Sequence, residues 1–403
     1  MRGTEEAYAY YKAVFERVPK PFAFVDLDLL DRNIASIAQA AGGKKVRIAS
    51  KSVRCVDVLR RILGSVPSVY QGIMCYTADE AALLAREGFD DLLLGYPQWQ
   101  PERLGELIAL IGEGRSIVFM VDCAEHVRQI ERLAAERGVV VPLCLDIDMS
   151  ADYPGLHFGV WRSPLSSWAH VRPVAEGIMA SPWLALEGIM GYEAQIAGVG
   201  DNMPGKMLKN RVVRWLKKRS VSEVAERRRE VVEGLLELGA ELRFVNAGGT
   251  GSLDSSRQER WVTEITAGSG FYAPGLFDHY ASFRYEPAAA YAVEVVRRPR
   301  PDIVTCMGGG YTASGAVGLE KQAKVYLPAG LELIPLEGAG EVQTPLRVKS
   351  GGAEPVLAIG DPVFFRHAKA GELCERFTKL YAVSEGQIVA EYPTYRGMGA
   401  CFV

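Results

Sequence analysis

The chain has 403 residues, of which 48% are hydrophobic and 24% charged, a balance typical of a globular protein rather than a disordered one. Its formal net charge of −3, from 46 basic and 49 acidic side chains, gives no support for nucleic acid or an anionic membrane as the main partner. This length favours two domains. Seven scattered cysteines, no signal peptide and no membrane-spanning stretch predict a soluble, reduced, cytoplasmic protein.

The first part of the chain alternates short apolar runs with helical stretches. The runs are PFAFVDLD, KVRIAS, SVYQGIMCY, DLLLGYP, SIVFMVD, VVPLCLDID, LALEGIMGY and LRFVNAGG. Apolar strands that alternate with helices indicate parallel βα units, and eight of them over roughly 230 residues match a closed (β/α)8 barrel of the TIM type. A doubly wound open sheet is the alternative, because periodicity does not reveal closure.

The hydrophobic pattern of the sequence changes after about residue 280. Short alternating runs such as AYAVEVVR and AKVYL follow, punctuated by Pro and Gly and without a long helical period. This pattern is typical of antiparallel sheet. We expect a barrel over residues 21–280 and a mostly antiparallel β domain over residues 281–403, with residues 1–20 packed beside it. The basic stretch from Lys206 is expected to form one amphipathic barrel helix.

A lysine stands at the end of one apolar run, KVRIASKSVRC (residues 45–55). The C-terminal end of a barrel strand faces the active site, so Lys51 is placed where catalytic groups lie. Burial behind Val46 and Ile48 disfavours the charged form of an amine, and a neutral amine can form a Schiff base with a carbonyl. The alternative is a lysine that only marks where the strand leaves the core.

A glycine-rich segment, FVNAGGTGSLDSS, follows the run counted as the eighth strand. Its glycines allow close approach of a ligand, and its hydroxyl groups can donate hydrogen bonds. Loops after the last two strands of such barrels are the usual phosphate site. A second segment, EITAGSGFYAPG, comes directly afterwards. A strand-end lysine together with a phosphate loop suggests pyridoxal 5′-phosphate (PLP), bound through its aldehyde at one end and its phosphate at the other.

With these motifs the sequence resembles the fold-type III PLP enzymes, whose barrel is of the alanine racemase N-terminal type, and within them the D-threonine aldolase and D-serine dehydratase group. PFAFVDLDLLDRNI, RIASKS, FVNAGGTGS and EITAGSGFY carry the resemblance, in the order and spacing typical of that group. It implies that Lys51 forms the Schiff base and that Tyr192 lies beside the pyridine nitrogen. The residues implied to hold the phosphate are Gly248, Gly249, Thr250, Gly268 and Ser269.

The sequence departs from the family pattern at two places. Where the family carries an arginine near the phenolic oxygen of the cofactor, this chain offers His157, with Arg162 five residues later. The resemblance also implies a divalent ion (Mn, Mg or Zn) held by a histidine and a cysteine or aspartate two residues on. His367 matches the histidine, but Lys369 occupies the second position. Cys374, with Glu372, is the alternative partner of His367, since such ligands suit zinc.

The resemblance implies a PLP-dependent lyase that cleaves a D-configured β-hydroxy amino acid into glycine, or another small amino acid, and an aldehyde. His367 is expected to act on the β-hydroxyl group. The alternatives are a D-serine-type dehydratase that yields a keto acid and ammonia, a racemase with Tyr311 as second acid–base group, and a non-catalytic PLP carrier. The expected partners are an amino acid substrate and a second copy of the chain in a homodimer.

Overall fold

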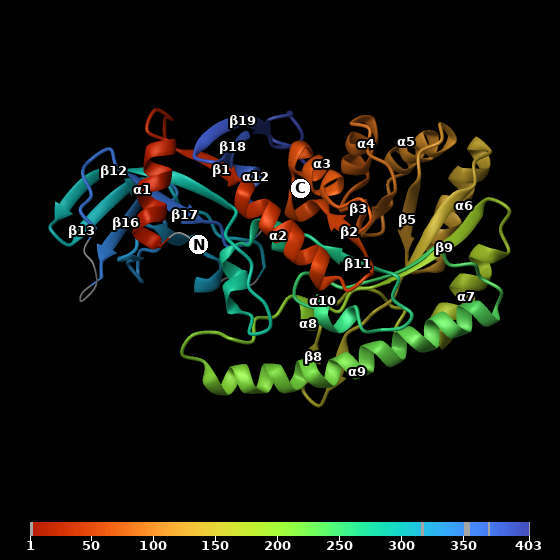
Figure 1. The fold of residues 1–403 in the computed structure, drawn as a ribbon. Helices are drawn as coiled ribbons and strands as arrows, with labels where there is room; N and C mark the ends of the chain where they lie inside the picture. The colour runs from red at the N-terminus through yellow and green to blue at the C-terminus, as the bar shows by residue number, and fades with distance from the viewer. Residues whose placement is uncertain (1–2, 316–317, 350–354, 370, 403) are drawn as a thin grey trace.

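The computed structural model describes residues 3–315, 318–349, 355–369 and 371–402. Within them a closed eight-stranded parallel barrel lies beside a nine-stranded, mostly antiparallel sheet (Figure 1). The predicted (β/α)8 barrel with a C-terminal β domain is confirmed. The doubly wound alternative is wrong, because the parallel sheet closes on itself where β11 pairs with β2.

The barrel strands are short and almost wholly buried, as expected for a parallel sheet covered by helices. In barrel order they are β2 (Lys45–Ala49), β3 (Tyr70–Cys75), β4 (Leu92–Leu94), β5 (Ile117–Val121), β6 (Val141–Asp146), β9 (Leu184–Gly191), β10 (Phe244–Ala247) and β11 (Glu264–Ala267). A hairpin of β7 (Ala151–Tyr153) and β8 (Leu156–Phe158) is inserted after β6.

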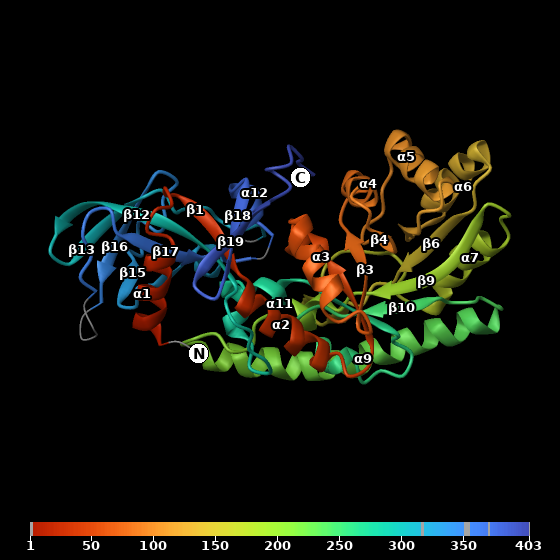
Figure 2. The same ribbon diagram turned by 45° about the horizontal axis from the view of Figure 1, so that its top comes forward.

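The helices of the barrel half alternate with these strands. They are α2 (Leu27–Ala40), α3 (Val56–Ser65), α4 (Ala78–Arg86), α5 (Pro101–Gly112), α6 (Ala124–Arg137), α7 (Trp168–Met179), α8 (Ala194–Ala197), α9 (Met207–Glu237), α10 (Leu253–Ser256) and α11 (Ser269–Tyr272). Short 3-10 turns cover η1 (Ser50–Ser52) and η2 (Gly275–His279). The basic stretch forms the single helix α9, which runs along the lower edge of the molecule in Figures 1 and 2. No helix in the described ranges combines the length and apolarity needed to cross a membrane.

The antiparallel sheet contains the remaining strands. They are β1 (Phe22–Asp26), β12 (Ala289–Arg300), β13 (Ile303–Met307), β14 (Lys324–Leu327), β15 (Leu331–Leu333), β16 (Gln343–Val348), β17 (Pro362–Arg366), β18 (Lys379–Ser384) and β19 (Gln387–Pro393). Helix α1 (Thr4–Val14) packs on it through Tyr11 and through Phe15 at the C-terminal cap. These two rings join those of Phe22, Phe24 and Phe364 in a separate aromatic core. The 3-10 turn η3 (Leu319–Lys321) and helix α12 (Leu373–Arg376) lie in this half of the chain.

One strand assignment made from the sequence is wrong. The run at residues 22–26, counted as the first barrel strand, forms β1 between β12 and β18 of the antiparallel sheet. The eighth barrel strand is instead β11, in the segment EITAGSG. An apolar run followed by a helix has the same local pattern in either sheet, and only the strand partners differ. Lys51 therefore follows the first barrel strand, and the two glycine segments follow the seventh and eighth.

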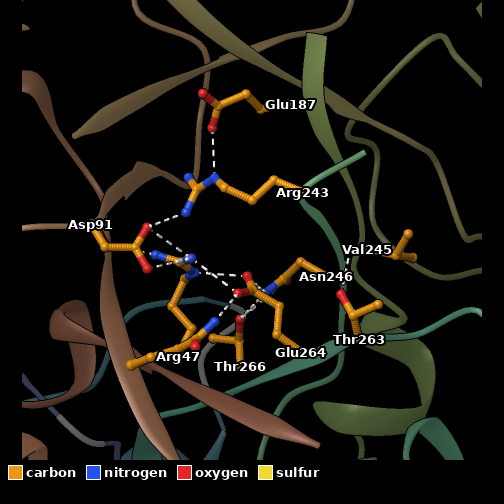
Figure 3. Close-up of polar contacts among 10 residues, drawn as sticks. Arg47, Asp91, Glu187, Arg243, Val245, Asn246, Thr263, Glu264 and Thr266 are labelled. Carbon is orange, nitrogen blue, oxygen red and sulfur yellow. Dashed lines mark hydrogen bonds and ion pairs between the residues drawn. The ribbon is translucent and has the colours of Figure 1, made fainter. Parts of the chain in front are cut away.

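A buried network of charged groups joins strands across the barrel (Figure 3). Arg47 of β2, which is fully buried, donates from Nε to Glu264 Oε1 of β11 at 2.7 Å and from Nη1 to the Asp91 carbonyl at 2.7 Å. Asn246 of β10 donates to Glu264 Oε1 at 2.8 Å and to Thr266 Oγ1 at 2.9 Å. These bonds satisfy the buried charges and tie β2, β10 and β11 together.

Candidate active site

A cavity of about 770 Å³ opens at the C-terminal ends of the barrel strands. All nine predicted cofactor-binding residues line it, and they come from five separate connections that follow barrel strands. They are Lys51, His157, Arg162, Tyr192, Gly248, Gly249, Thr250, Gly268 and Ser269. A lysine at one end and a glycine cradle at the other thus share a single cavity, as a small cofactor that bridges the two requires.

Lys51 lies on η1 immediately after β2, and its amine reaches into the cavity. The Nζ atom donates a hydrogen bond to the Tyr96 hydroxyl at 2.7 Å. The turn that carries Lys51 is fixed by the Ser50 hydroxyl, which donates to the Met74 carbonyl at 2.9 Å, and by Arg54 Nε, which donates to the Lys51 carbonyl at 2.9 Å. The amine is therefore presented by an anchored backbone.

Tyr96 is a site residue that the sequence analysis did not single out. Burial raises the pKa of its phenol, but the nearby Lys51 and Arg162 lower it by more, so that its pKa lies below the ordinary value of 10.0. The guanidinium of Arg162 lies 4.8 Å from the centre of its ring. Tyr96 lies two residues after the end of β4 in the run LLLGYP, so a polar ring just beyond a barrel strand was the available signal.

The glycine segment between β10 and α10 packs too tightly for side chains. Gly248 has φ +88°, and a Cβ there would lie 2.5 Å from Ile265 Cγ2. A Cβ on Gly249 would lie 2.9 Å from Ala197 Cβ. Thr250 Oγ1 accepts a hydrogen bond from the Gly270 amide at 3.0 Å, which joins this segment to the one after β11. The two glycine segments thus form one continuous wall.

A buried carboxylate, Glu193, holds this wall in place, and the sequence analysis did not identify it either. Glu193 accepts hydrogen bonds from the Gly248 amide at 3.2 Å, from Ser252 Oγ at 2.9 Å and from Ser256 Oγ. Arg228 of α9, fully buried, donates to Glu193 Oε2 at 3.2 Å. The long helix α9 therefore reaches the glycine wall through one ion pair.

Tyr192 and Arg162 also line the cavity, and the Arg162 guanidinium lies 5.8 Å from the centre of the Tyr192 ring. Burial raises the pKa of the Tyr192 phenol to about 12, which keeps it neutral. Arg162 donates from Nε to Asp146 Oδ2 at 2.7 Å and from Nη2 to the Gly95 carbonyl at 2.6 Å. Burial raises the pKa of Asp146 to about 6, because its desolvation outweighs the opposing effect of Arg162.

His157 belongs to the inserted hairpin that forms one side of the cavity. Its ring stacks on Trp161 with the centroids 3.7 Å apart, and its Nδ1 lies 2.7 Å from Asp152 Oδ1. Its Nε2 atom is buried without a hydrogen-bond partner in the described part of the chain. Both alternatives from the sequence, His157 and Arg162, thus line the cavity, and Arg162 is the one that contacts the tyrosine pair.

The predicted C-terminal ligands, in contrast, are not among the residues that line the cavity. His367 is fully buried, and neither ring nitrogen has a hydrogen-bond partner among the described residues. Burial, assisted by Arg366, lowers its pKa to about 3. Cys374 is buried and its Sγ donates to the Val53 carbonyl at 3.3 Å. The hydroxyl of Tyr311, the candidate racemase acid–base group, is likewise buried away from the cavity.

Within the described residues, the sole group of three or more His, Cys, Asp or Glu ligand atoms close enough to share a metal ion lies elsewhere. It consists of Asp122, Cys123 and His126 at the start of α6. His126 Nδ1 lies 2.9 Å from Asp122 Oδ1 and 3.2 Å from Cys123 Sγ. The structure therefore does not assemble a three-ligand group around His367 and Cys374.

The sequence matches a known protein family over the residues that form the barrel and its cavity loops. Residues 25–273 match the family model described as "Alanine racemase, N-terminal domain". A 3-hydroxy-D-aspartate aldolase from Paracoccus denitrificans (strain Pd 1222) is 25% identical over 256 residues, which cover 62% of this chain and 60% of that protein. A second 3-hydroxy-D-aspartate aldolase from Paracoccus denitrificans is 27% identical over 187 residues, 45% of each protein. The chain thus aligns with less than two thirds of these curated relatives.

Solved structures share the fold over nearly the whole chain. D-Threonine aldolase from Filomicrobium marinum superposes with a TM-score of 0.78 at 16% identity, covering 94% of this chain and 96% of that one. D-threo-3-Hydroxyaspartate dehydratase from Delftia sp. HT23 superposes with a TM-score of 0.72 at 19% identity, covering 94% and 98% of the two chains. At these identities the likeness establishes the two-part architecture.

Proposed function

Since the chain belongs to the alanine racemase N-terminal domain family, we propose that it is a PLP-dependent lyase that cleaves a D-configured β-hydroxy amino acid. The products are a smaller amino acid and an aldehyde. The aldolase names of its curated relatives support this reaction. The observation that carries the proposal is the single cavity shared by Lys51 and the glycine wall.

The residues of the cavity fit PLP in both charge and shape. Lys51 would hold the cofactor covalently through Nζ, while the glycine wall would receive its phosphate. Side chains at Gly248 and Gly249 would clash with their neighbours, so these positions present bare backbone, and the Ser269 and Ser52 hydroxyls lie 3.3 Å apart beside them. Tyr192 would lie at the pyridine nitrogen as a neutral phenol. When bound, PLP supplies an electron sink for the bonds at the α-carbon of an amino acid.

We propose Tyr96, rather than His367, as the group that accepts the proton of the β-hydroxyl. Tyr96 lines the cavity, its hydroxyl is 2.7 Å from Lys51 Nζ, and its pKa is lowered despite burial because Lys51 and Arg162 favour the phenolate. A phenolate that accepts this proton allows the Cα–Cβ bond to break, and the β-carbon then leaves as the aldehyde. His367 is buried and is not among the residues that line the cavity, which supports the choice of Tyr96.

The residues at the predicted metal position do not fit a metal ion. Burial raises the pKa of the Cys374 thiol well above its ordinary value, and the thiol donates to a carbonyl, whereas a metal requires the thiolate. Burial and the nearby Arg366 lower the pKa of His367. Lys369 lines the cavity two residues beyond His367 and carries a positive charge of its own. We derive no step through a metal ion.

The reaction is tested by incubating PLP-loaded protein with D-threonine, D-serine and D-threo-3-hydroxyaspartate and separating the products. The proposal expects glycine with acetaldehyde from D-threonine, and glycine with glyoxylate from 3-hydroxyaspartate. The Lys51→Ala variant is expected to fold, to lose the visible absorbance of the bound cofactor and to lose turnover. Keto acid and ammonia as the products would establish the dehydratase reaction instead, and interconversion of D- and L-alanine would establish a racemase.

We also propose that the chain forms a homodimer and works in a reducing compartment such as the cytoplasm. Leu208, Val212 and Trp215 are exposed at helical spacing on one face of α9, which supports a subunit contact there. The seven cysteines are all free, which supports the compartment. Sedimentation velocity is expected to give a dimer for the natural protein and a monomer for Leu208→Asp; a natural monomer would contradict the proposal.

A further inference from the structure

Basic side chains from both halves of the chain line the cavity. Among the described residues, Lys51, Arg162, Lys321 and Lys369 line it, against two carboxylates, Asp122 and Asp146. Both carboxylates have partners already: Asp146 bonds Arg162 at 2.7 Å, and Asp122 lies 2.9 Å from His126. The cavity therefore holds an excess of positive charge that the protein itself does not neutralise.

Two of these cations, Lys321 and Lys369, have no role in the cofactor binding and proton transfer proposed above. Lys321 comes from η3 and Lys369 from the loop after β17, so both belong to the antiparallel half of the chain. Neither makes an ion pair with a carboxylate in the described ranges, and Lys369 Nζ donates to the neutral Ser314 Oγ at 3.0 Å. Burial lowers the pKa of Lys369, and Lys51 and Lys321 lower it further, while Glu372 opposes them. Cationic side chains that line one cavity stabilise an anion bound among them.

We propose that Lys321 and Lys369 form an anion-binding subsite for a carboxylate on the substrate side chain, so that the preferred substrate is an acidic D-3-hydroxy amino acid. This proposal rests on the proposed lyase function and names its substrate class. The two lysines face the cavity from the half of the molecule opposite the glycine wall, which leaves the cofactor phosphate to the barrel loops.

The subsite also replaces the charge of a divalent ion. An ammonium at position 369 repels a metal cation but attracts the same oxygen atoms that a metal would polarise. The side-chain carboxylate of a dicarboxylic amino acid offsets the charge of these two lysines, whereas a monocarboxylic amino acid brings no carboxylate to this subsite and leaves both of them without a counter-charge. Selectivity for acidic substrates therefore follows from the attraction between the two lysines and the side-chain carboxylate, and it requires no added metal.

The test measures binding without turnover, on the full-length, PLP-loaded and chelator-treated protein. Dissociation constants of succinate and butyrate are determined by titration calorimetry for the natural protein and for Lys369→Met, Lys321→Met, Lys369→Arg and Lys379→Met. Lys379 lies on the exposed face of β18, paired with Glu391 at 2.7 Å, and serves as the matched control. Methionine keeps the length of the side chain while it removes the charge.

The natural protein is expected to bind succinate roughly 10- to 100-fold more tightly than butyrate, in line with hydrogen bonds to a charged group. Lys369→Met and Lys321→Met are expected to lose this preference, while Lys369→Arg and Lys379→Met retain it. The kcat/KM ratio of D-threo-3-hydroxyaspartate to D-threonine is expected to fall by a similar factor in the two methionine variants. Higher salt is expected to weaken succinate more than butyrate.

Equal weakening of succinate and butyrate in the methionine variants would overturn the proposal, because the lysines would then bind only the α-carboxylate. An unchanged preference would overturn it too, as would a preference that appears only after a divalent metal is added back. A protein that prefers succinate but yields no aldehyde would contradict the lyase function and retain the subsite. Aldehyde release without any preference would retain the lyase function and reject the subsite.

Discussion

The hydrogen bond between Lys51 and Tyr96 is the contact on which the proposed chemistry depends. The phenol is held between two cations, Lys51 and Arg162, which stabilise its deprotonated form against the opposing effect of burial. A base of this kind works at a pH below the ordinary pKa of tyrosine.

Tyr96→Phe is expected to reduce kcat by roughly 10²- to 10⁴-fold, the usual contribution of a general base, while the cofactor stays bound. In the natural protein the rate is expected to rise with pH as Tyr96 loses its proton, and this rise is expected to vanish in the variant. Tyr381→Phe, on β18 and outside the cavity lining, is the control. A pH profile that keeps its alkaline rise in Tyr96→Phe would remove Tyr96 from the reaction.

The neutral, buried ring of His367 predicts sensitivity to acid. Its pKa falls from 6.5 to about 3 on folding, because burial and Arg366 disfavour the imidazolium. The unfolded chain takes up this proton below about pH 6.5 and the folded chain does not until about pH 3, so stability is lost across that interval as pH falls. At pH 5 the loss from this one group is about 2 kcal/mol.

His367→Leu is expected to reduce the loss of unfolding free energy between pH 7 and pH 5 by about that 2 kcal/mol, measured by urea denaturation at each pH. His170→Ala serves as the control, since His170 lies exposed on α7. An identical pH dependence in the natural protein and in His367→Leu would contradict the assignment of a neutral buried imidazole.

At the scale of elements, the backbone of the glycine wall depends on the side chain of Glu193, which belongs to a different loop. Glu193 follows β9 and binds the Gly248 amide and two serine hydroxyls, while Arg228 of α9 neutralises it. The loop after the seventh barrel strand is thus held by the loop after the sixth and by helix α9, which precedes β10 in the chain. A phosphate cradle made of flexible glycine obtains its rigidity from this carboxylate.

Glu193→Gln is expected to weaken PLP binding and to lower the free energy of unfolding by roughly 2–3 kcal/mol, as hydrogen bonds to a charged group are lost. Fluorescence titration with PLP and urea denaturation measure the two effects. Glu187→Gln is the matched control, because Glu187 lies on β9 with a partly exposed pair to Arg243. Equal effects of the two variants on PLP affinity would show that Glu193 does not organise the wall.

At the scale of the whole molecule, the parallel barrel closes where β11 pairs with β2. Strand β11 meets β2 there, and the fully buried Arg47 links them through Glu264. The same network reaches Asn246 and Thr266, which line the cavity. Closure of the barrel and the floor of the site are therefore held by one set of charges.

Arg47→Met is expected to lower the free energy of unfolding by about 3–5 kcal/mol, because it leaves Glu264 buried without its partner. Arg243→Met removes a half-exposed arginine of the same network, whose side chain is 39% accessible, and is expected to cost less than about 1 kcal/mol. Urea denaturation of both variants provides the comparison, and a cost for Arg47→Met no greater than that for Arg243→Met would reject the burial argument.

The sequence by itself determined the features that depend on neighbouring residues. Strand and helix periodicity is local, so it predicted the barrel class and the change to antiparallel sheet near residue 280. Lys51 at a strand end and the glycines near 249 are local signals too, because a short apolar run and its following turn carry their meaning within a few residues.

Only the tertiary structure decided which distant groups meet. It placed β1 in the antiparallel sheet, paired Tyr96 with Lys51, joined Glu193 to the glycine wall, and kept His367 out of the cavity while Lys369 lines it. Strand partners, burial and the convergence of charges arise from contacts between residues far apart in the chain. A one-dimensional pattern does not contain them, since the same apolar run or histidine fits several such environments equally well.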